Sequence, residues 1–293
     1  FFDENLIGNR KQSAIEKLAK LQKADGSWSW MPGMDGSSYI TTSVAEMLVR
    51  VNAMTGKQKE TAAMLGKALR WLDKNAVKEV EEMKRNQKKY KTQPSFPSRE
   101  MLQYIYIRSL DNTGMSAAAS NAISYLMPLL KKEVKSQTMY DKAMTAVILS
   151  KRGETAAARS YVQSLKEYTV YREDMGRYYD TKRAGYSWRD YRIPTQAMAI
   201  MALQTVTPDD RQTVSEMQRW LLQEKRTQAW DTPLNTVDAI YAFLADNTLT
   251  TNVEPTRISI DGKVLDMPAA TAGIGYRKTA IQNPEGKTLT AEK

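Results

Sequence analysis

The stretch Leu21-Gln22-Lys23-Ala24-Asp25-Gly26-Ser27-Trp28-Ser29-Trp30 ends one helical pattern, and Thr42, Ala45 and Leu48 mark the helix that follows. The same order returns twice, as Gly185-Tyr186-Ser187-Trp188 before Thr195-Gln196-Ala197 and as Gln228-Ala229-Trp230 before Thr236 and Ala239. A Trp side chain can fill the gap between neighbouring hairpins, and small Thr and Ala residues let the incoming helix pack closely. The internal repeat therefore predicts a mainly α fold, an α/α toroid of stacked antiparallel helical hairpins.

Apolar residues recur with helical spacing from residue 1 to about 248. One such face carries Ile40, Val44, Met47, Leu48 and Val51. This spacing is that of an amphipathic helix, and we expect about ten helices joined mostly by short turns. The run Thr207-Pro208-Asp209-Asp210 predicts a cap followed by a helix start, and Asn235 with Asp238 is a weaker cap signal. Pro128 is expected to kink its helix or to lie in an early turn.

The pattern changes to strands near residue 253. Ile258 and Ile260 alternate with polar residues, and Asp261-Gly262 is a strong hairpin signal. Another strand is predicted over 276–281 and another turn over 283–286. We therefore divide the chain into a toroid over 1–250 and, over 251–293, either the start of a β-rich domain or edge strands on the helices. Forty residues supply too few strands for an independent sheet.

Composition excludes several classes of chemistry. The 293 residues include no Cys and no His, so a Ser-His-Asp triad, a thiol nucleophile and a zinc site of Cys or His are impossible within this sequence. We expect no catalytic residue, metal or cofactor. The net charge is +10, and the densest basic stretch, Lys84 to Lys91, directly follows Glu79, Glu81 and Glu82. Mixed charges of this kind favour a solvated helix face, and we expect no nucleic acid as partner.

The aromatic turns are the candidate binding or structural residues. They are Trp28, Trp30, Tyr186, Trp188 and Trp230. Two interpretations stay open for them: plugs between helices, or a platform for a sugar or a peptide in the mouth of the ring. The long segment from Tyr171 to Arg192 is expected to be a loop, and its Asp174, Asp180 and Asp190 could serve acid/base chemistry on a glycan. Surface ion pairs are the expected role of these three carboxylates.

Three ordered segments resemble bacterial alpha-2-macroglobulin-like proteins, in the form found in gut Bacteroidetes. The first runs from Ala14 through Asp25-Gly26-Ser27-Trp28-Ser29-Trp30-Met31-Pro32-Gly33 to Tyr39-Ile40-Thr41. The second is Met175-Gly176-Arg177-Tyr178-Tyr179, Gly185-Tyr186-Ser187-Trp188 and Pro194-Thr195-Gln196-Ala197. The third is Trp220-Leu221-Leu222, Lys225, Thr227, Trp230 and Thr236-Val237-Asp238-Ala239. Together they cover nearly all of residues 10 to 248.

The resemblance implies the helical thioester-type domain of this family, a toroid with a terpenoid cyclase-like fold set among β-sandwich domains. It implies a non-catalytic part of an endopeptidase inhibitor that traps proteases, in the periplasm or on the outer surface of a bacterial envelope. The implied partners are host or competitor proteases and the neighbouring β-sandwich domains. Contact with a membrane would come only through a lipid anchor elsewhere in the parent chain. Many relatives carry a Cys-to-Gln thioester, but without Cys no thioester residue can be assigned here.

Two alternatives stay open. One is an α/α-toroid enzyme that acts on glycans or isoprenoids through carboxylates. The other is a basic surface that binds nucleic acid or an anionic envelope polymer, which predicts strongly salt-dependent binding. We also expect the chain to be cut from a longer protein, because it begins with Phe1-Phe2 and its C-terminal strands look interrupted.

Overall fold

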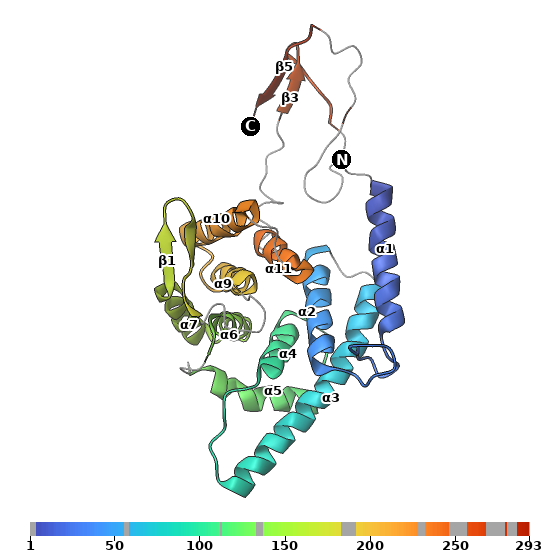
Figure 1. Cartoon of the computed structure of the whole chain (residues 1–293), viewed down its shortest axis with the longest axis vertical. Coiled ribbons are helices and arrows are strands. Elements are labelled where there is room, and N and C mark those ends of the chain that lie inside the picture. Colours follow the sequence, from blue (N-terminus) through green and yellow to red (C-terminus); the bar gives the residue numbers. More distant parts are fainter. Residues whose placement is uncertain are drawn as a thin grey trace.

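The computed structural model describes residues 4–55, 59–111, 113–132, 137–182, 192–227, 232–245, 257–267, 279 and 286–292. Within these residues the chain forms ten helices and five strands, labelled as in Figure 1. The helices are α1 (Glu4–Leu21), α2 (Ser38–Thr55), α3 (Lys59–Tyr90), α4 (Arg99–Leu110), α5 (Ala117–Leu130), α6 (Met139–Lys151), α7 (Thr155–Glu167), α9 (Arg192–Val206), α10 (Arg211–Thr227) and α11 (Pro233–Leu244). The predicted mainly α architecture is confirmed.

The helices alternate between an inner and an outer layer. Helices α2, α4, α6, α9 and α11 form a chain of neighbours in which each packs on the next, and α3, α7 and α10 pack on this layer from outside. Helix α3 in turn contacts α1 and α5. Inner helices such as α6 and α9 are buried almost along their whole length. The outer helix α3 buries a single stripe, so the two layers match the α/α toroid that the repeat predicts.

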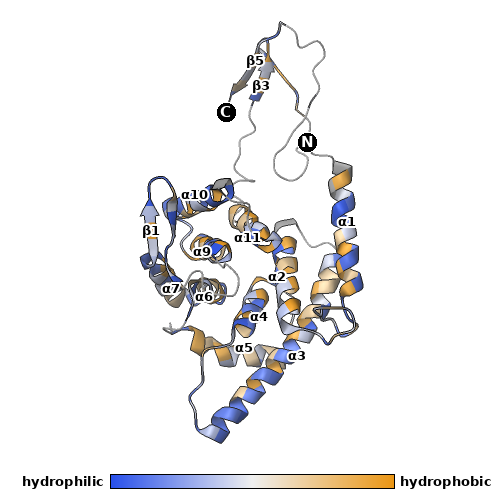
Figure 2. Ribbon diagram, in the orientation of Figure 1, coloured by the Kyte–Doolittle hydropathy of each residue, from blue (hydrophilic) through white to orange (hydrophobic). Residues whose placement is uncertain are grey.

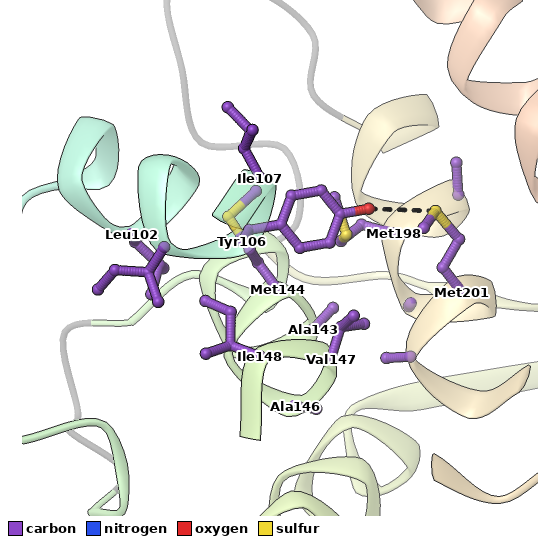
Figure 3. Packing of buried hydrophobic residues seen from close by; sticks show 14 of the residues in the cluster. Leu102, Tyr106, Ile107, Ala143, Met144, Ala146, Val147, Ile148, Met198 and Met201 are labelled. Atoms are coloured by element: carbon purple, nitrogen blue, oxygen red, sulfur yellow. Dashed lines mark hydrogen bonds between the residues drawn. The ribbon is translucent and has the colours of Figure 1, made fainter. Parts of the chain in front are cut away.

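Small and flexible side chains form the centre of the core. Figure 3 shows Tyr106 of α4 among residues of α6 and α9, with its hydroxyl 3.9 Å from the sulfur of Met201. Ala143 and Ala146 of α6 are fully buried beside this ring. Alanine lets helix backbones approach closely, and methionine fills the irregular space that remains.

The Thr and Ala positions of the repeat lie in this inner layer. Ala45, Ala197 and Ala239 are buried on α2, α9 and α11, and so are Thr42 and Thr195. The three copies thus place their small residues at matching points in the fold, where each inner helix meets its neighbours.

Part of the segment expected to be a loop is a β-hairpin. Strands β1 (Thr169–Arg172) and β2 (Gly176–Tyr179) pair antiparallel, and β2 packs on α10. Gly176 makes the close approach possible, because its φ is +89° and a Cβ at this position would lie 2.3 Å from the Glu216 carbonyl oxygen. The side chain of Gln196 then joins the layers by donating to the carbonyl oxygens of Arg177 and Met217.

Two predictions about helix ends are wrong. Thr232 rather than Asn235 caps α11, and its hydroxyl accepts from the backbone N–H of Asn235. Asp210 rather than Thr207 caps α10, because its carboxylate accepts from the backbone N–H of Thr213. Of the two roles expected for Pro128, the early turn is wrong, because this residue lies near the C-terminal end of α5.

The C-terminal strands lie apart from the helices in Figure 1. They are β3 (Arg257–Ile260), β4 (Lys263–Val264) and β5 (Leu289–Glu292), ordered β4-β3-β5 with antiparallel pairing. The Asp261-Gly262 turn is confirmed, since Ile260 pairs with Lys263 and both turn residues have positive φ, +48° and +78°. The strand predicted over 276–281 and most of the turn over 283–286 lie outside the described residues.

Candidate functional site

A buried charged cluster lies between the first and the last inner helix. Glu46 and Arg50 are one turn apart on α2 and form an ion pair. Arg50 also reaches α11, where its Nη1 lies 2.6 Å from the Asp238 carboxylate, 188 residues away in sequence. Gln103 of α4 donates to Glu46. We call Glu46, Arg50 and Asp238 the seam cluster, because it joins the two ends of the inner layer.

Aromatic rings surround the seam cluster. The guanidinium carbon of Arg50 lies 4.9 Å from the ring centroid of Tyr241 and 5.7 Å from that of Tyr106. Cation–π attraction of this kind strengthens when the cation is removed from water. The cluster therefore holds α2, α4 and α11 together with charge-assisted contacts rather than with aliphatic packing alone.

Burial and neighbouring charges shift the pKa values of the groups in the seam cluster. Burial acts to lower the pKa of Arg50, but Glu46, Tyr106, Asp238 and Tyr140 together outweigh it and the pKa is raised, so Arg50 remains a cation. Burial raises the pKa of Glu46, and the nearby Arg50 opposes this shift. Burial also raises the pKa of Tyr106, which therefore stays neutral.

A cavity of about 90 Å³ lies beside the cluster. Its lining includes a residue from the first turn of each of the five inner helices, namely Tyr39 on α2, Glu100 on α4, Tyr140 on α6, Pro194 on α9 and Asn235 on α11. All inner helices therefore begin at the same end of the ring. Among the described residues, no group of three or more acidic side chains is arranged to hold a metal ion.

Trp28 is the best-defined of the predicted aromatic turns. Its side chain is 2% exposed, and its indole N–H donates to the carbonyl oxygen of Leu18 at 3.0 Å. Its backbone N–H donates to the hydroxyl of Thr41, at the start of α2. These contacts join the end of α1 to the beginning of α2, which is the position that a plug between helices would take.

Trp30 has a different environment. It is 60% exposed and stacks on Tyr39, with ring centroids 5.5 Å apart and planes 4° apart. It borders a surface groove of about 410 Å³ together with Leu21 and Met31. The other aromatic candidates, Tyr186, Trp188 and Trp230, lie outside the described residues.

The predicted carboxylates are not brought together. Asp174 lies in the exposed turn between β1 and β2 and pairs with Arg172 at 3.0 Å. Asp180 is exposed beyond the other end of β2. All four residues of β2 lie between the two acids, and the strand rises ~3.3 Å per residue. Asp190 lies outside the described residues.

Sequence reasoning did not single out the seam cluster. One signal was present, since Glu46 and Arg50 have the i,i+4 spacing of a helical ion pair. No local signal pointed to Asp238 as the third member. From the sequence, Asp238 belongs to a cap motif and to the third resembling segment, whereas in the structure its carboxylate pairs with Arg50 of α2.

The comparisons with known proteins agree with this architecture. A model of the A-macroglobulin TED domain matches residues 4–245. The chain belongs to this family. The match begins with α1 and ends just after α11, so it covers all the described helices and leaves β3, β4 and β5 outside. A comparison with curated protein sequences finds no match.

A second buried ion pair joins the layers of the TED domain. Arg108 of α4 donates from Nε to Asp73 of α3 at 3.0 Å, and the hydroxyl of Tyr104 donates to the same carboxylate oxygen at 2.7 Å. Arg108 also lies 3.4 Å from Asp111. The pair fixes an inner helix to an outer one, as the seam cluster fixes two inner helices.

None of the described helices of the TED domain is both long and apolar enough to cross a membrane.

Proposed function

We propose that this TED domain is a non-catalytic scaffold within a longer alpha-2-macroglobulin-like protein that traps proteases at a bacterial cell envelope. The family match over residues 4–245 carries the proposal. Its partners in this role are host or competitor proteases, which the whole protein engulfs, and the β-sandwich domains that adjoin the ring.

The residue content supports a scaffold without covalent chemistry. A thioester of this family joins a Cys sulfur to a Gln side chain, and the 293 residues contain no Cys. Any covalent capture would therefore depend on a Cys outside this sequence. Trapping by enclosure needs no reactive group, because the protease is held by the surrounding protein.

The contacts of the described polar residues also support a structural role. Arg50 is engaged by two carboxylates and two aromatic rings, and Arg108 by Asp73 and Asp111. The cavity beside the seam cluster, about 90 Å³, is smaller than the roughly 300–1,000 Å³ typical of small-molecule sites. A ring closed by such contacts suits a rigid body that neighbouring domains move during a conformational change.

Incubation of the full-length natural protein with an active broad-specificity protease tests the proposal. We expect the protein to be cleaved and to become more compact in small-angle X-ray scattering. The trapped protease should lose activity on a large protein substrate and keep it on a small peptide substrate, because only the small substrate can enter the enclosure.

The same protease with its nucleophile replaced is the matched control, and it should produce no compaction. An active protease that cleaves the protein yet keeps full activity on the large substrate would contradict trapping.

A further inference from the structure

The last turns of α3 and the residue that follows them carry a concentration of positive charge. Five cations fall within eight residues, and no acidic residue interrupts them: Lys84, Arg85, Lys88, Lys89 and Lys91. We call residues 84–91 the basic tip. The helical residues 84–90 span only about 10 Å at ~1.5 Å per residue, so the charges are close together.

The basic tip projects from the helical body. Figure 1 shows α3 running past α5 to the end of the molecule opposite the C-terminal strands, and Figure 2 shows its last turns as strongly hydrophilic. The last fully buried residue of α3 is Val80. Beyond it the helix is held from one side, where the Tyr125 hydroxyl of α5 donates to Gln87 at 2.6 Å and Lys84 lies 4.5 Å from the Tyr125 ring.

The charges of the basic tip are not neutralised within the described chain. None of its five cations forms an ion pair there, whereas Lys131 and Lys166, also on the surface, pair with Glu154 and Asp210. The C-terminal end of a helix attracts cations through its dipole. That attraction falls off within the last turn, so it does not account for Lys84 and Arg85, which lie one to two turns further back.

We propose that the basic tip binds the surface of a lipid bilayer that contains anionic phospholipid. A cluster of four to eight Lys and Arg residues on a helix has the charge density that anionic headgroups attract. Tyr90, 62% exposed within the tip, adds a ring with one apolar and one polar end, which suits the headgroup region.

The shape of the tip favours a planar partner. A projecting helix end can touch a flat surface without hindrance from the rest of the molecule, while the short length of the tip offers little track for a nucleic acid strand. The proposal does not depend on protease trapping, because it concerns a surface that the ring merely supports.

Co-sedimentation of the whole 293-residue chain with vesicles tests it. The vesicles contain either 30% phosphatidylglycerol in phosphatidylethanolamine or phosphatidylcholine alone, at 50 and 500 mM NaCl. We expect binding only to the anionic vesicles and a steep loss at the higher salt, since exposed charges are then screened.

A triple variant, Lys88→Gln, Lys89→Gln and Lys91→Gln, should lower the vesicle partition coefficient by about 100-fold, because each cation near an anionic surface contributes about fivefold. The matched control, Lys11→Gln, Lys17→Gln and Lys20→Gln, removes the same charge from exposed positions of α1 and should retain most of the binding. Circular dichroism at 222 nm checks that both variants keep their helices.

Three results would overturn the proposal. The first is no sedimentation of the wild-type chain with phosphatidylglycerol vesicles at 50 mM NaCl. The second is equal loss in the two triple variants, which would assign binding to net charge rather than to the basic tip. The third is tighter, tip-dependent binding to a 20-base single-stranded oligonucleotide than to the vesicles, which would assign the tip to nucleic acid.

Discussion

Replacement of Arg50 by Met tests whether the seam cluster holds the ring closed. Met is similar in length but uncharged, so Arg50→Met leaves Glu46 buried without its cation and breaks the contact with Asp238. Removal of one partner from a buried ion pair costs about 3–5 kcal/mol. If the free energy of unfolding falls by about 4 kcal/mol and the urea m-value is about 3 kcal/mol/M, the midpoint of urea unfolding should fall by about 1.3 M.

The loss should also depend on pH, and its sign follows from Glu46. Burial raises the folded-state pKa of Glu46 above 4.5, against the effect of Arg50. A raised pKa means that the folded chain binds this proton more tightly than the unfolded chain. The contribution of Glu46 to folding stability is therefore fully present below its unfolded-state pKa and is lost as pH rises through its folded-state pKa. Without Arg50 the folded pKa rises further, and Arg50→Met should be more destabilised at pH 8 than at pH 5.

Urea unfolding followed by circular dichroism at pH 5 and pH 8 measures both effects. Lys131→Met is the matched control, because it removes a cation from the exposed pair with Glu154 and should change stability by less than about 1 kcal/mol. Addition of Glu46→Gln to Arg50→Met should remove the pH dependence. The reasoning fails if Arg50→Met moves the midpoint no further than Lys131→Met, or if its loss is the same at both pH values.

Three further substitutions test the packing of the ring, each by urea unfolding. Trp28→Ala should lower the free energy of unfolding by about 3–5 kcal/mol, because it empties a buried site. Trp30→Ala, at an exposed position, should lower it by less than about 1 kcal/mol. Similar losses in the two variants would contradict the role of Trp28 as a plug between helices. Gly176→Ala should lower the free energy of unfolding by more than about 2 kcal/mol, since its Cβ would meet backbone atoms. Gly153→Ala should lower it by only about 1 kcal/mol, because that residue has positive φ but lies in open space. Equal losses would contradict the close approach of β2 to α10. Asp73→Asn should cost about 3 kcal/mol, because it leaves a buried arginine with one fewer carboxylate, and an unchanged midpoint would show that this ion pair does not join the layers.

The local features of the fold were predictable from sequence. The 3.6-residue spacing of apolar residues and the repeated Trp turns predict stacked helical hairpins, and both depend on residues close together in the chain. Asp261-Gly262 predicts its turn because these residues tolerate positive φ at little cost. The family resemblance rested on the same turns, and the match over residues 4–245 confirms it.

Predictions that depended on competition between neighbours were wrong. Asn235 and Thr232 both resemble caps, and the position of Pro233 in the first turn of α11 makes Thr232 the cap. The segment 169–179 is rich in polar residues, yet it pairs as β1 and β2 because Gly176 lets the hairpin lie against α10. Neither outcome follows from composition alone.

The sequence by itself determined the helices, their amphipathic faces, the family and the absence of any Cys or His chemistry, because each of these depends on residue type or on local spacing. Only the tertiary structure decided that Arg50 meets Asp238 across 188 residues, that Asp174 and Asp180 lie at opposite ends of a strand, and that no cation of the basic tip forms an ion pair among the described residues. The physical reason is that such contacts depend on how the ring closes. Closure is set by the packing of all the helices together, and no single stretch of the chain records it.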